Sequence, residues 1–450
     1  MLANSSRSKS LLILLVLLAA SEFIVRGPVR FLRAADFNDF ISPYIQSRAL
    51  IEGMDPYSPE ILVQLWPTEG TRRPDFIAKD LAEGTLIMKR GIPTAYPLTC
   101  LLMLAPLAIM PWPVAHLAWL AINICLILVL IWSLLKWCGF ERNDWRGYVF
   151  VAFSLALAPL NTGVATGSIV IPTVALCGLA LSRDQRVDSE IFAGILFGIA
   201  VCWKPQIGLP FLAYYLLRKR WRLCGIAFGV VFTAAMLAMG RLAISGTSWL
   251  QNYQTDNKIL FASGILSDFT ERNPMRFSLI NLQVLLYAGL HRVFAANLLA
   301  LAVSAALFGI WVVLVMRTDS LDALLPVSAI VVLSLLPVYH RFYDAVLLIF
   351  PIAWSLRDFS LSKKHFARGT FLLTVPFLIP GGSILEQLEL RGQIPGAIRW
   401  SWYWIRIAMP HQIWLLLLLS VLLLWRMAAG SKRTTAVDTP ISSGGEYEAI

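Results

Sequence analysis

Residues 113–135 read PVAHLAWLAINICLILVLIWSLL, an apolar run that contains no lysine, arginine, aspartate or glutamate. Roughly 20 apolar residues in a helix cross the hydrocarbon core of a bilayer, so this stretch predicts a membrane span. Similar runs recur along the whole chain, which has 450 residues, 58% of them hydrophobic and only 14% charged. A soluble protein could not bury so much apolar surface, and the chain is therefore predicted to be an all-α polytopic membrane protein.

About twelve apolar runs predict the helices of the membrane domain. They lie at 11–25, 93–110, 113–135, 147–160, 166–182, 191–217, 221–244, 292–316, 322–339, 343–356, 369–380 and 411–427. Several are shorter than the roughly 20 residues that a helix perpendicular to the membrane needs to span it. Short helices are expected where helices break around a polar cavity. The first run could be a secretory signal peptide, but a retained first span is favoured because the spans that follow need an oriented start.

Clusters of lysine and arginine predict the orientation, because they concentrate on the cytoplasmic side of membrane proteins. The clusters near residues 7–9, 218–222, 363–368 and 426–433 are expected inside. The same alternation places residues 26–92, 245–291, 339–343 and 381–410 outside. One loop conflicts, since residues 136–146 fall outside despite their positive charge. If 93–110 is re-entrant and 191–217 is a hairpin, this loop moves inside, so eleven to thirteen spans are expected.

The net charge of +11 is assigned to these anchors and to contacts with anionic lipids, and no nucleic-acid partner is expected. The outer segment 26–92 holds nine basic and nine acidic residues, so it is neutral enough to be translocated. It is predicted to carry short interfacial helices at 41–51 and 61–66. Residues 1–430 are predicted to form one membrane domain, and residues 431–450 a disordered cytoplasmic tail.

Two carboxylates, Asp36 and Asp39, stand just beyond the first span. Their spacing places both on one face of a helical turn. They form either a catalytic acidic pair or a solvated helix start, where aspartate is favoured anyway.

Cationic residues interrupt the apolar runs at two places. Lys204 lies within an apolar run, where an ammonium group usually faces a polar cavity or an anion, or else extends to the membrane surface. His340 and Arg341 lie between two later runs, either as a phosphate site or as an ordinary polar loop. The chain contains no phosphate-binding glycine-rich loop, no H-E-x-x-H and no dinucleotide fingerprint.

In their order these pieces resemble glycosyltransferase family 87, one of the GT-C membrane glycosyltransferases. The resemblance spans about residues 39–350. The matching pieces are Asp39-Phe40, Leu50 to Tyr57 (LIEGMDPY), Tyr96-Pro97-Leu98, Ala193-Gly194, Lys204-Pro205 with the basic block 218–222, and the His340 motif. The sequence departs from the family at Gly167-Ser168, where Gly-Gln is usual, and in having one histidine in the late motif.

The resemblance implies a GT-C-like bundle of about twelve spans that acts as an inverting hexosyltransferase, with mannose as the favoured sugar. The donor would be a polyprenyl-phosphate sugar and the acceptor a hydroxyl of a glycan or glycolipid, at the outer face of the cytoplasmic membrane. Together with the chemistry of sugar transfer, it assigns roles to seven residues. Asp39 would be the base with Asp36 in reserve, Lys204, His340 and Arg341 would hold the donor phosphate, and Tyr44 and Tyr96 would make weaker substrate contacts.

Neither a cofactor nor a metal ion is expected, although the two aspartates could offer a metal two oxygen atoms. The main alternative is a transporter or flippase for a lipid-linked or anionic solute, with Lys204 as the substrate's counter-charge. A membrane scaffold without activity is the third possibility.

Overall fold

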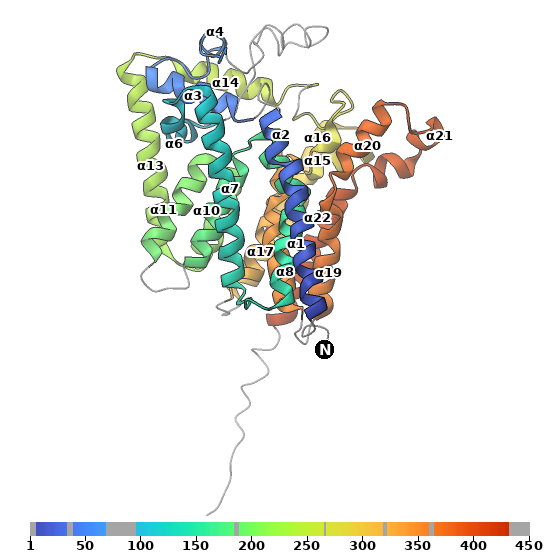
Figure 1. Cartoon of the computed structure of the whole chain (residues 1–450). Coiled ribbons are helices and arrows are strands. Elements are labelled where there is room, and N and C mark those ends of the chain that lie inside the picture. Colours follow the sequence, from blue (N-terminus) through green and yellow to red (C-terminus); the bar gives the residue numbers. More distant parts are fainter. Residues whose placement is uncertain are drawn as a thin grey trace, which may run out of the picture.

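The computed structural model describes residues 6–33, 39–68, 96–183, 189–264, 267–317, 322–359 and 364–431. Within these ranges the chain forms α-helices with short 3-10 and π segments, and the one extended pairing there is an isolated bridge between Leu279 and Arg341. The long helices run side by side, and several short helices gather at one end of the bundle (Figure 1). The predicted all-α architecture is confirmed.

Long helices alternate with short ones along the chain. The first half comprises α1 (Ser6–Arg26), α2 (Pro28–Arg33), α3 (Ile41–Glu52), α4 (Pro59–Gln64), α6 (Leu98–Ala108), α7 (Trp112–Trp137), α8 (Trp145–Ala156), α9 (Ala158–Thr166), α10 (Val170–Arg183), α11 (Glu190–Trp203) and α12 (Pro205–Leu217). The second half comprises α13 (Trp221–Ile244), α14 (Trp249–Leu260), η2 (Arg276–Ser278), α15 (Leu282–Leu290), α16 (Val293–Met316), α17 (Leu324–Leu333), η3 (Phe342–Leu348), α18 (Ile349–Asp358), α19 (Lys364–Thr374), η4 (Val375–Leu378), α20 (Gly381–Leu390), α21 (Gly396–Arg399), η5 (Trp404–Ala408) and α22 (His411–Ser431).

Six helical stretches in the described ranges are long and apolar enough to cross a membrane. They are Ser8–Arg33, Trp112–Trp137, Trp221–Ile244, Val293–Met316, His365–Leu390 and His411–Gly430, and the bent pair α8 and α9 adds a seventh if it is one span. The chain is therefore a multi-pass membrane protein. The predicted number of about twelve spans is not confirmed, because α10, α11 and α17 are apolar helices of only 10–14 residues. At 1.5 Å per residue such helices are shorter than the bilayer core of roughly 30 Å.

Residues 191–217 form a helical hairpin, which was one of the two alternatives that the sequence allowed for this run. Helices α11 and α12 meet at Lys204 and fold back on each other, so closely that a Cβ on Gly208 would lie 2.9 Å from the backbone nitrogen of Val201. Pro205 explains the break, because a proline pushes the residue before it out of the helical region. Lys204 accordingly has φ −146° and ψ 87°.

The loop 136–146 lies at the same end of the bundle as the start of α1 (Figure 1). The Lys9 Nζ donates to Asn143 Oδ1 at 3.1 Å. This placement follows from α6, whose 11 residues are too few for a crossing and which packs against α3 at the opposite end. The conflict in the charge pattern thus disappears, since the loop joins the other basic helix ends.

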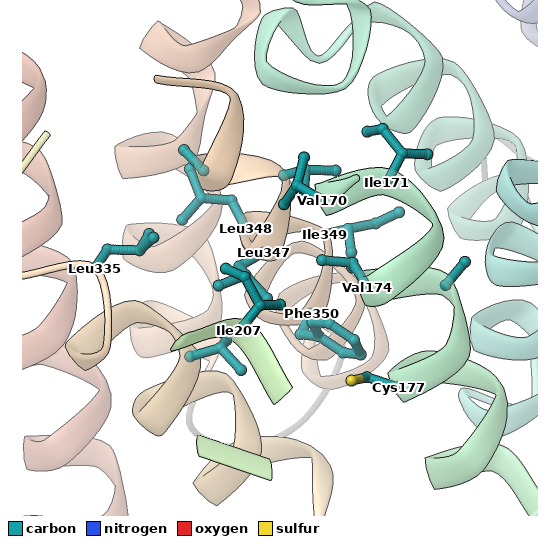
Figure 2. Close-up of a cluster of buried hydrophobic side chains, with 14 of the residues drawn as sticks. Val170, Ile171, Val174, Cys177, Ile207, Leu335, Leu347, Leu348, Ile349 and Phe350 are labelled. Carbon is teal, nitrogen blue, oxygen red and sulfur yellow. The ribbon is translucent and has the colours of Figure 1, made fainter. Parts of the chain in front are cut away.

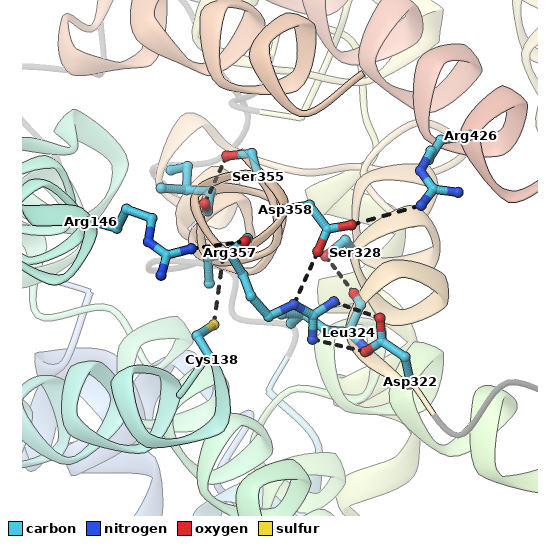
Figure 3. Close-up of polar contacts among 11 residues, drawn as sticks. Cys138, Arg146, Asp322, Leu324, Ser328, Ser355, Arg357, Asp358 and Arg426 are labelled. Carbon is cyan, nitrogen blue, oxygen red and sulfur yellow. Dashed lines mark hydrogen bonds and ion pairs between the residues drawn. The ribbon is translucent and has the colours of Figure 1, made fainter. Parts of the chain in front are cut away.

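An ion-pair network joins the helices at this end, which is called the N-terminal end below (Figure 3). Arg357 donates to both carboxylate oxygens of Asp322 and, at 3.2 Å, to Asp358. Arg426 of α22 lies 3.8 Å from Asp358, and Arg146 donates to the Arg357 carbonyl. The network therefore ties α8, α18 and α22 to the start of α17.

Parts of the four segments expected on the outer face meet at the opposite end, called the site end below. Asn252 donates to Asp55 Oδ2 at 2.7 Å, which joins the first segment to the second. The backbone N–H of Phe277 donates to Glu386 Oε1 at 2.6 Å, and Leu279 pairs with Arg341. The sequence thus grouped these segments correctly; the side of the membrane they face stays a prediction.

Helix α3 is more buried than the predicted interfacial helix. Most of its side chains, including Ile41, Tyr44 and Gln46, are buried, and the helix packs against α6. Helix α4 overlaps the second predicted stretch and buries Leu62. Residues 69–92 of this segment and the predicted tail beyond Ser431 lie outside the described residues.

A dense apolar core lies between the short helices. Figure 2 shows Val170, Val174 and Cys177 of α10 facing Ile207 of α12 and the chain at 347–350, where η3 continues into α18. These side chains are completely buried. Since close-packed cores tolerate little displacement, this cluster holds the end of η3 in one position relative to α10 and α12.

The close packing of α11 on α13 depends on small residues. A Cβ on Gly198 would lie 2.6 Å from Val230 Cβ and 2.8 Å from the Ala227 carbonyl oxygen. We expect Gly198→Ala to lower the stability by about 1–3 kcal/mol, because the two backbones must separate. Thermal unfolding of the purified protein in detergent measures this loss.

Gly229 of α13 provides the control, because a Cβ there would meet no atom within 4 Å. Gly229→Ala is expected to leave the unfolding temperature unchanged or slightly higher, since alanine favours helix more than glycine does. Equal unfolding temperatures for the two variants would contradict the close approach of the helices.

Candidate active site

The break between α11 and α12 presents Lys204 to a buried carboxylate. Its Nζ lies 2.5 Å from Asp344 Oδ1, and the two side chains are only 12% and 3% exposed. The break also leaves the Cys202 carbonyl without a helical partner, and Thr99 donates to it at 3.0 Å. Lys204 is therefore not a lysine that extends to the membrane surface, but half of a buried ion pair.

Asp344 accepts hydrogen bonds from three directions. Besides Lys204, the Nδ1 of His340 lies 3.0 Å from Asp344 Oδ2, and the backbone N–H of Arg341 donates to the same oxygen at 3.1 Å. A buried ion pair recovers its desolvation cost only when such additional hydrogen bonds satisfy its atoms. Asp344 is thus the residue around which the cationic side of the site is built.

The segment carrying His340 and Arg341 is held from both sides. The backbone N–H of Ile280 donates to the His340 carbonyl at 3.1 Å, and Leu279 pairs with Arg341 in the isolated bridge. Helix η3 begins directly afterwards, with Asp344 in its first turn. His340 is completely buried, and its Nε2 has no hydrogen-bond partner among the residues that the structure describes.

Asp39 reaches the same site from the first outer segment. Its backbone N–H donates to the carbonyl of Thr166 at the end of α9. Gly167 follows there with φ 68°, and a Cβ at this position would lie 2.7 Å from the ring of Phe31. A left-handed glycine thus ends α9 and leaves room for the segment that carries Asp39.

Trp119 of α7 connects the two sides of the site. Phe40, which follows Asp39, stacks on Trp119 with ring centroids 4.6 Å apart. Trp203, which precedes Lys204, makes an edge contact with Trp119, with ring centroids 6.4 Å apart. The indole N–H of Trp119 donates to the Gly167 carbonyl at 2.9 Å. The neighbours of both charged residues are therefore packed on one buried indole ring.

The pKa of the Asp39 carboxyl is raised above its ordinary value. Burial is the main cause and Asp344 adds to it, whereas the charge of Arg341, a hydrogen bond with Tyr343 and the charge of Lys204 lower the pKa. Its Oδ2 is buried and has no hydrogen-bond partner within the described part of the chain. A partly desolvated carboxylate of raised pKa beside cations is suited to accept a proton.

Three tyrosines surround these charges. The Arg341 Nε donates to the Tyr339 hydroxyl at 2.6 Å, and the Lys204 Nζ lies 5.1 Å from the ring centre of Tyr343. Tyr96 interacts electrostatically with Asp39 and Arg341. The site thus combines two carboxylates, a lysine, an arginine and polar aromatic side chains at one end of the bundle.

Most of the predicted site residues are brought together. Asp39, Lys204, His340, Arg341 and Tyr96 belong to one cluster.

Tyr44 is not part of this cluster through its polar atom, because its hydroxyl donates to the Met110 carbonyl and its ring packs on Trp112. Asp36 lies outside the described residues.

The sequence analysis assigned no role to Asp344, Tyr343 or Trp119. Asp344 belongs to the same polar stretch as His340, and its position four residues later was the available signal. Among the described residues, no group of three or more histidine, cysteine or acidic side chains is placed to hold a metal ion. The expectation that no metal is required stays a prediction.

Comparison with known proteins identifies a family to which the sequence is similar. The sequence model described as glycosyltransferase family 87 matches residues 94–338, more than half of the chain. The match includes Lys204 but begins after Asp39 and ends before His340. No solved structure matches the chain.

Two curated relatives are named alpha-(1->3)-arabinofuranosyltransferase, both from Mycobacterium tuberculosis, strains CDC 1551 / Oshkosh and ATCC 25618 / H37Rv. Each is 26% identical over 182 residues, which cover 38% of this chain. The matched part of the chain spans 41% of the length of these relatives.

The buried pair of Lys204 and Asp344 predicts a coupled loss of stability. Asp344→Asn is expected to cost about 3–5 kcal/mol, because the lysine would be left without its counter-charge. The double variant with Lys204→Met should recover much of this loss, since the charge disappears together with its partner. Thermal unfolding in detergent, followed by tryptophan fluorescence, measures both.

Glu271 supplies the control, because it pairs with His291 at 3.5 Å but its side chain is 61% exposed. Glu271→Gln is expected to change the stability by less than about 1 kcal/mol, as exposed ion pairs do. If Asp344→Asn were equally harmless, the pair would not organise the site.

Proposed function

The chain belongs to glycosyltransferase family 87, and on this premise we propose that it transfers a sugar from a polyprenyl-phosphate donor to an acceptor hydroxyl, with inversion at the anomeric carbon. The observation that carries the proposal is the juxtaposition of Asp39 with Lys204 and Arg341. Sugar transfer from a phosphate needs both a base and cations, one on each side of the reacting carbon. The cluster at the site end supplies both.

The base is Asp39 in this proposal. A sugar hydroxyl is a weak nucleophile, so a carboxylate takes its proton while the new carbon–oxygen bond forms. The bond between the anomeric carbon and the phosphate oxygen breaks at the same time, and the polyprenyl phosphate leaves with the bonding electrons. Because the acceptor attacks opposite the departing phosphate, the configuration at the anomeric carbon inverts.

The departing phosphate meets Lys204 and Arg341. Negative charge grows on it in the transition state, and fixed cations in a partly dry site stabilise that charge. Neither side chain is fully buried, whereas His340 is. We therefore assign His340 a positioning role, in which it and Lys204 fix Asp344 between them. This role differs from the expectation that His340 itself contacts the phosphate, which stays a prediction.

The sugar that is transferred must be identified by testing more than one donor. The expectation of mannose and of hexosyl transfer has no support in the curated relatives, whose names give arabinofuranosyl transfer. Both polyprenyl-phosphate mannose and polyprenyl-phosphate arabinofuranose belong in the assay, with glycans and glycolipids as acceptors. The polyprenyl phosphate is common to both donors and carries the mechanism above.

We place the enzyme in the cytoplasmic membrane with the site end facing the periplasm or exterior. The basic helix ends support this orientation, because the loop 136–146 and the start of α1 lie together at the N-terminal end. A lipid-linked donor then reaches the site from the membrane, and the acceptor reaches it from the aqueous side.

The transporter hypothesis is less well supported. It used Lys204 as the counter-charge of a solute at mid-membrane, but Lys204 pairs with Asp344 beside an outer segment. Binding near the bilayer midplane between repeated halves is the pattern expected of a transporter. An acidic residue brought to the cations by an extramembrane segment favours catalysis instead.

Asp39→Asn tests the proposed base. The variant keeps the shape of the side chain but cannot accept a proton, so kcat should fall by roughly 10²–10⁴-fold. The measurement is release of polyprenyl phosphate and glycosylation of the acceptor by purified protein, with unfolding temperatures compared. Glu52→Gln, an exposed carboxylate on α3, is the matched control and should retain full activity. Near-native activity of Asp39→Asn would remove the base from the mechanism.

The pH dependence provides a second test. Because the ionised form of Asp39 is the active base and its pKa is raised, kcat/KM should fall as the pH drops through that raised pKa. This acidic limb should lie above the ordinary aspartate pKa of about 3.9. Arg341→Gln removes a charge that lowers the pKa, so the limb should move to higher pH. A limb that stays in place would show that another group titrates.

A further inference from the structure

A cavity lies at the N-terminal end of the bundle, opposite the candidate active site. Its walls come from α12, α16, α17, α18 and α22, and its volume is about 250 Å³. This is below the roughly 300 Å³ at which sites for drug-sized ligands begin, so the cavity fits a small chemical group. Both charged and apolar side chains line it.

The cavity stands at the level where two candidate spans end. Val315 lines it from the last turn of the span Val293–Met316, and Met427 and Gly430 line it from the last turn of the span His411–Gly430. The head groups of a bilayer lie just beyond the hydrocarbon core that such spans cross. The cavity is therefore at the depth of lipid head groups.

The acidic side chains of the cavity are already paired. Arg357 donates to both carboxylate oxygens of Asp322 and to Asp358 at 3.2 Å (Figure 3). Arg218 and Arg426 also line the cavity. Three arginines thus face two aspartates, so this wall keeps a net positive charge and favours an anionic occupant.

Two hydrogen-bond donors of the wall are available to such an occupant. The Nη2 of Arg426 lies 3.8 Å from Asp358 Oδ2, which is too long for a hydrogen bond. Trp354 is only 1% exposed, and its indole N–H has no hydrogen-bond partner among the residues that the structure describes. A buried donor without an acceptor costs about 1–3 kcal/mol, so an occupant with acceptor oxygens removes a penalty.

We propose that this cavity binds a phosphate group, which accepts hydrogen bonds from Arg426 and from the indole N–H of Trp354. Guanidinium groups bind phosphate oxygens by strong, charge-assisted hydrogen bonds. The phosphate belongs either to a phospholipid of the adjoining leaflet or to a free anion. The site is separate from the donor site at Lys204 and does not depend on the proposed sugar transfer.

The position of the cavity gives its occupant a stabilising role. Helix α12 starts directly after Lys204 and brings Tyr214 to the cavity. The chain that carries Asp344 continues through η3 into α18, which brings Trp354. An occupant therefore contacts the far ends of both elements that form the central ion pair. Because it binds only the folded arrangement, it raises the unfolding temperature.

The test uses the full chain, purified in a maltoside detergent that contains no phosphate. Dioleoyl phosphatidylglycerol and inorganic phosphate are added separately, and the shift of the unfolding temperature is measured against sodium chloride of equal ionic strength. We expect a rise with at least one of the two probes. Arg426→Gln should weaken binding about tenfold, equivalent to about 1.4 kcal/mol, and reduce the shift accordingly.

Trp354→Phe provides a second variant, which keeps an aromatic ring but removes the N–H donor. It should also reduce the shift caused by the probe. Each shift is measured from the variant's own unfolding temperature without probe, so a change in basal stability cancels. If Arg426→Gln does not fold, Trp354→Phe decides alone.

Arg317→Gln is the matched control, because Arg317 is exposed at the end of α16 and does not line the cavity. It should keep the full shift, which separates a defined site from general attraction to the basic end and from the general stabilisation by phosphate salts.

The two probes distinguish the sources of the phosphate. A shift with phosphatidylglycerol alone supports a lipid head-group site, and an equal or larger shift with inorganic phosphate supports a site for a free anion. The absence of a shift with both probes would overturn the proposal. Equal shifts in Arg317→Gln, Trp354→Phe and the unchanged chain would also overturn it.

Discussion

The buried contact between Lys204 and Asp344 is the interaction on which the site depends. Lys204 stands where α11 ends, and Asp344 stands at the start of η3, 140 residues later. An unpaired charge at either position would be costly in this setting, so the hairpin and η3 must meet. His340 and the backbone N–H of Arg341 make the remaining hydrogen bonds to Asp344, which brings the Arg341 side chain into the site. One ion pair thereby assembles the cationic half of the site from distant segments.

The acidic half is positioned by aromatic packing instead of charge. Trp119 contacts both Phe40 and Trp203, the chain neighbours of Asp39 and Lys204. A buried indole in close-packed surroundings has little freedom to move, so the separation between the two halves is fixed by the protein interior. The backbone hydrogen bond from Asp39 to the end of α9 removes the remaining freedom of the acidic segment.

The proposed reaction brings together a donor from the membrane and an acceptor from the aqueous phase. Lys204 lies at the break between two apolar helices, whereas Asp39 belongs to a segment outside the candidate spans. The breaks between short helices supply the charged residues, because α11 ends directly before Lys204 and η3 begins two residues before Asp344. At the N-terminal end, the ion pairs of Arg357 hold α18 against the start of α17.

The sequence alone determined the membrane class, the helical architecture and most of the residues in the site. Hydrophobic runs and basic clusters carry that information locally, and a lysine inside an apolar run or an aspartate beyond a span is visible without a structure. It could not give the number of crossings, because a short apolar run looks the same whether it crosses or turns back. Nor could it identify Asp344 or Trp119, whose importance comes from partners far away in the chain. Only the tertiary structure decided these points, because burial, pairing and the meeting of α11, α12 and η3 are properties of packing between distant segments.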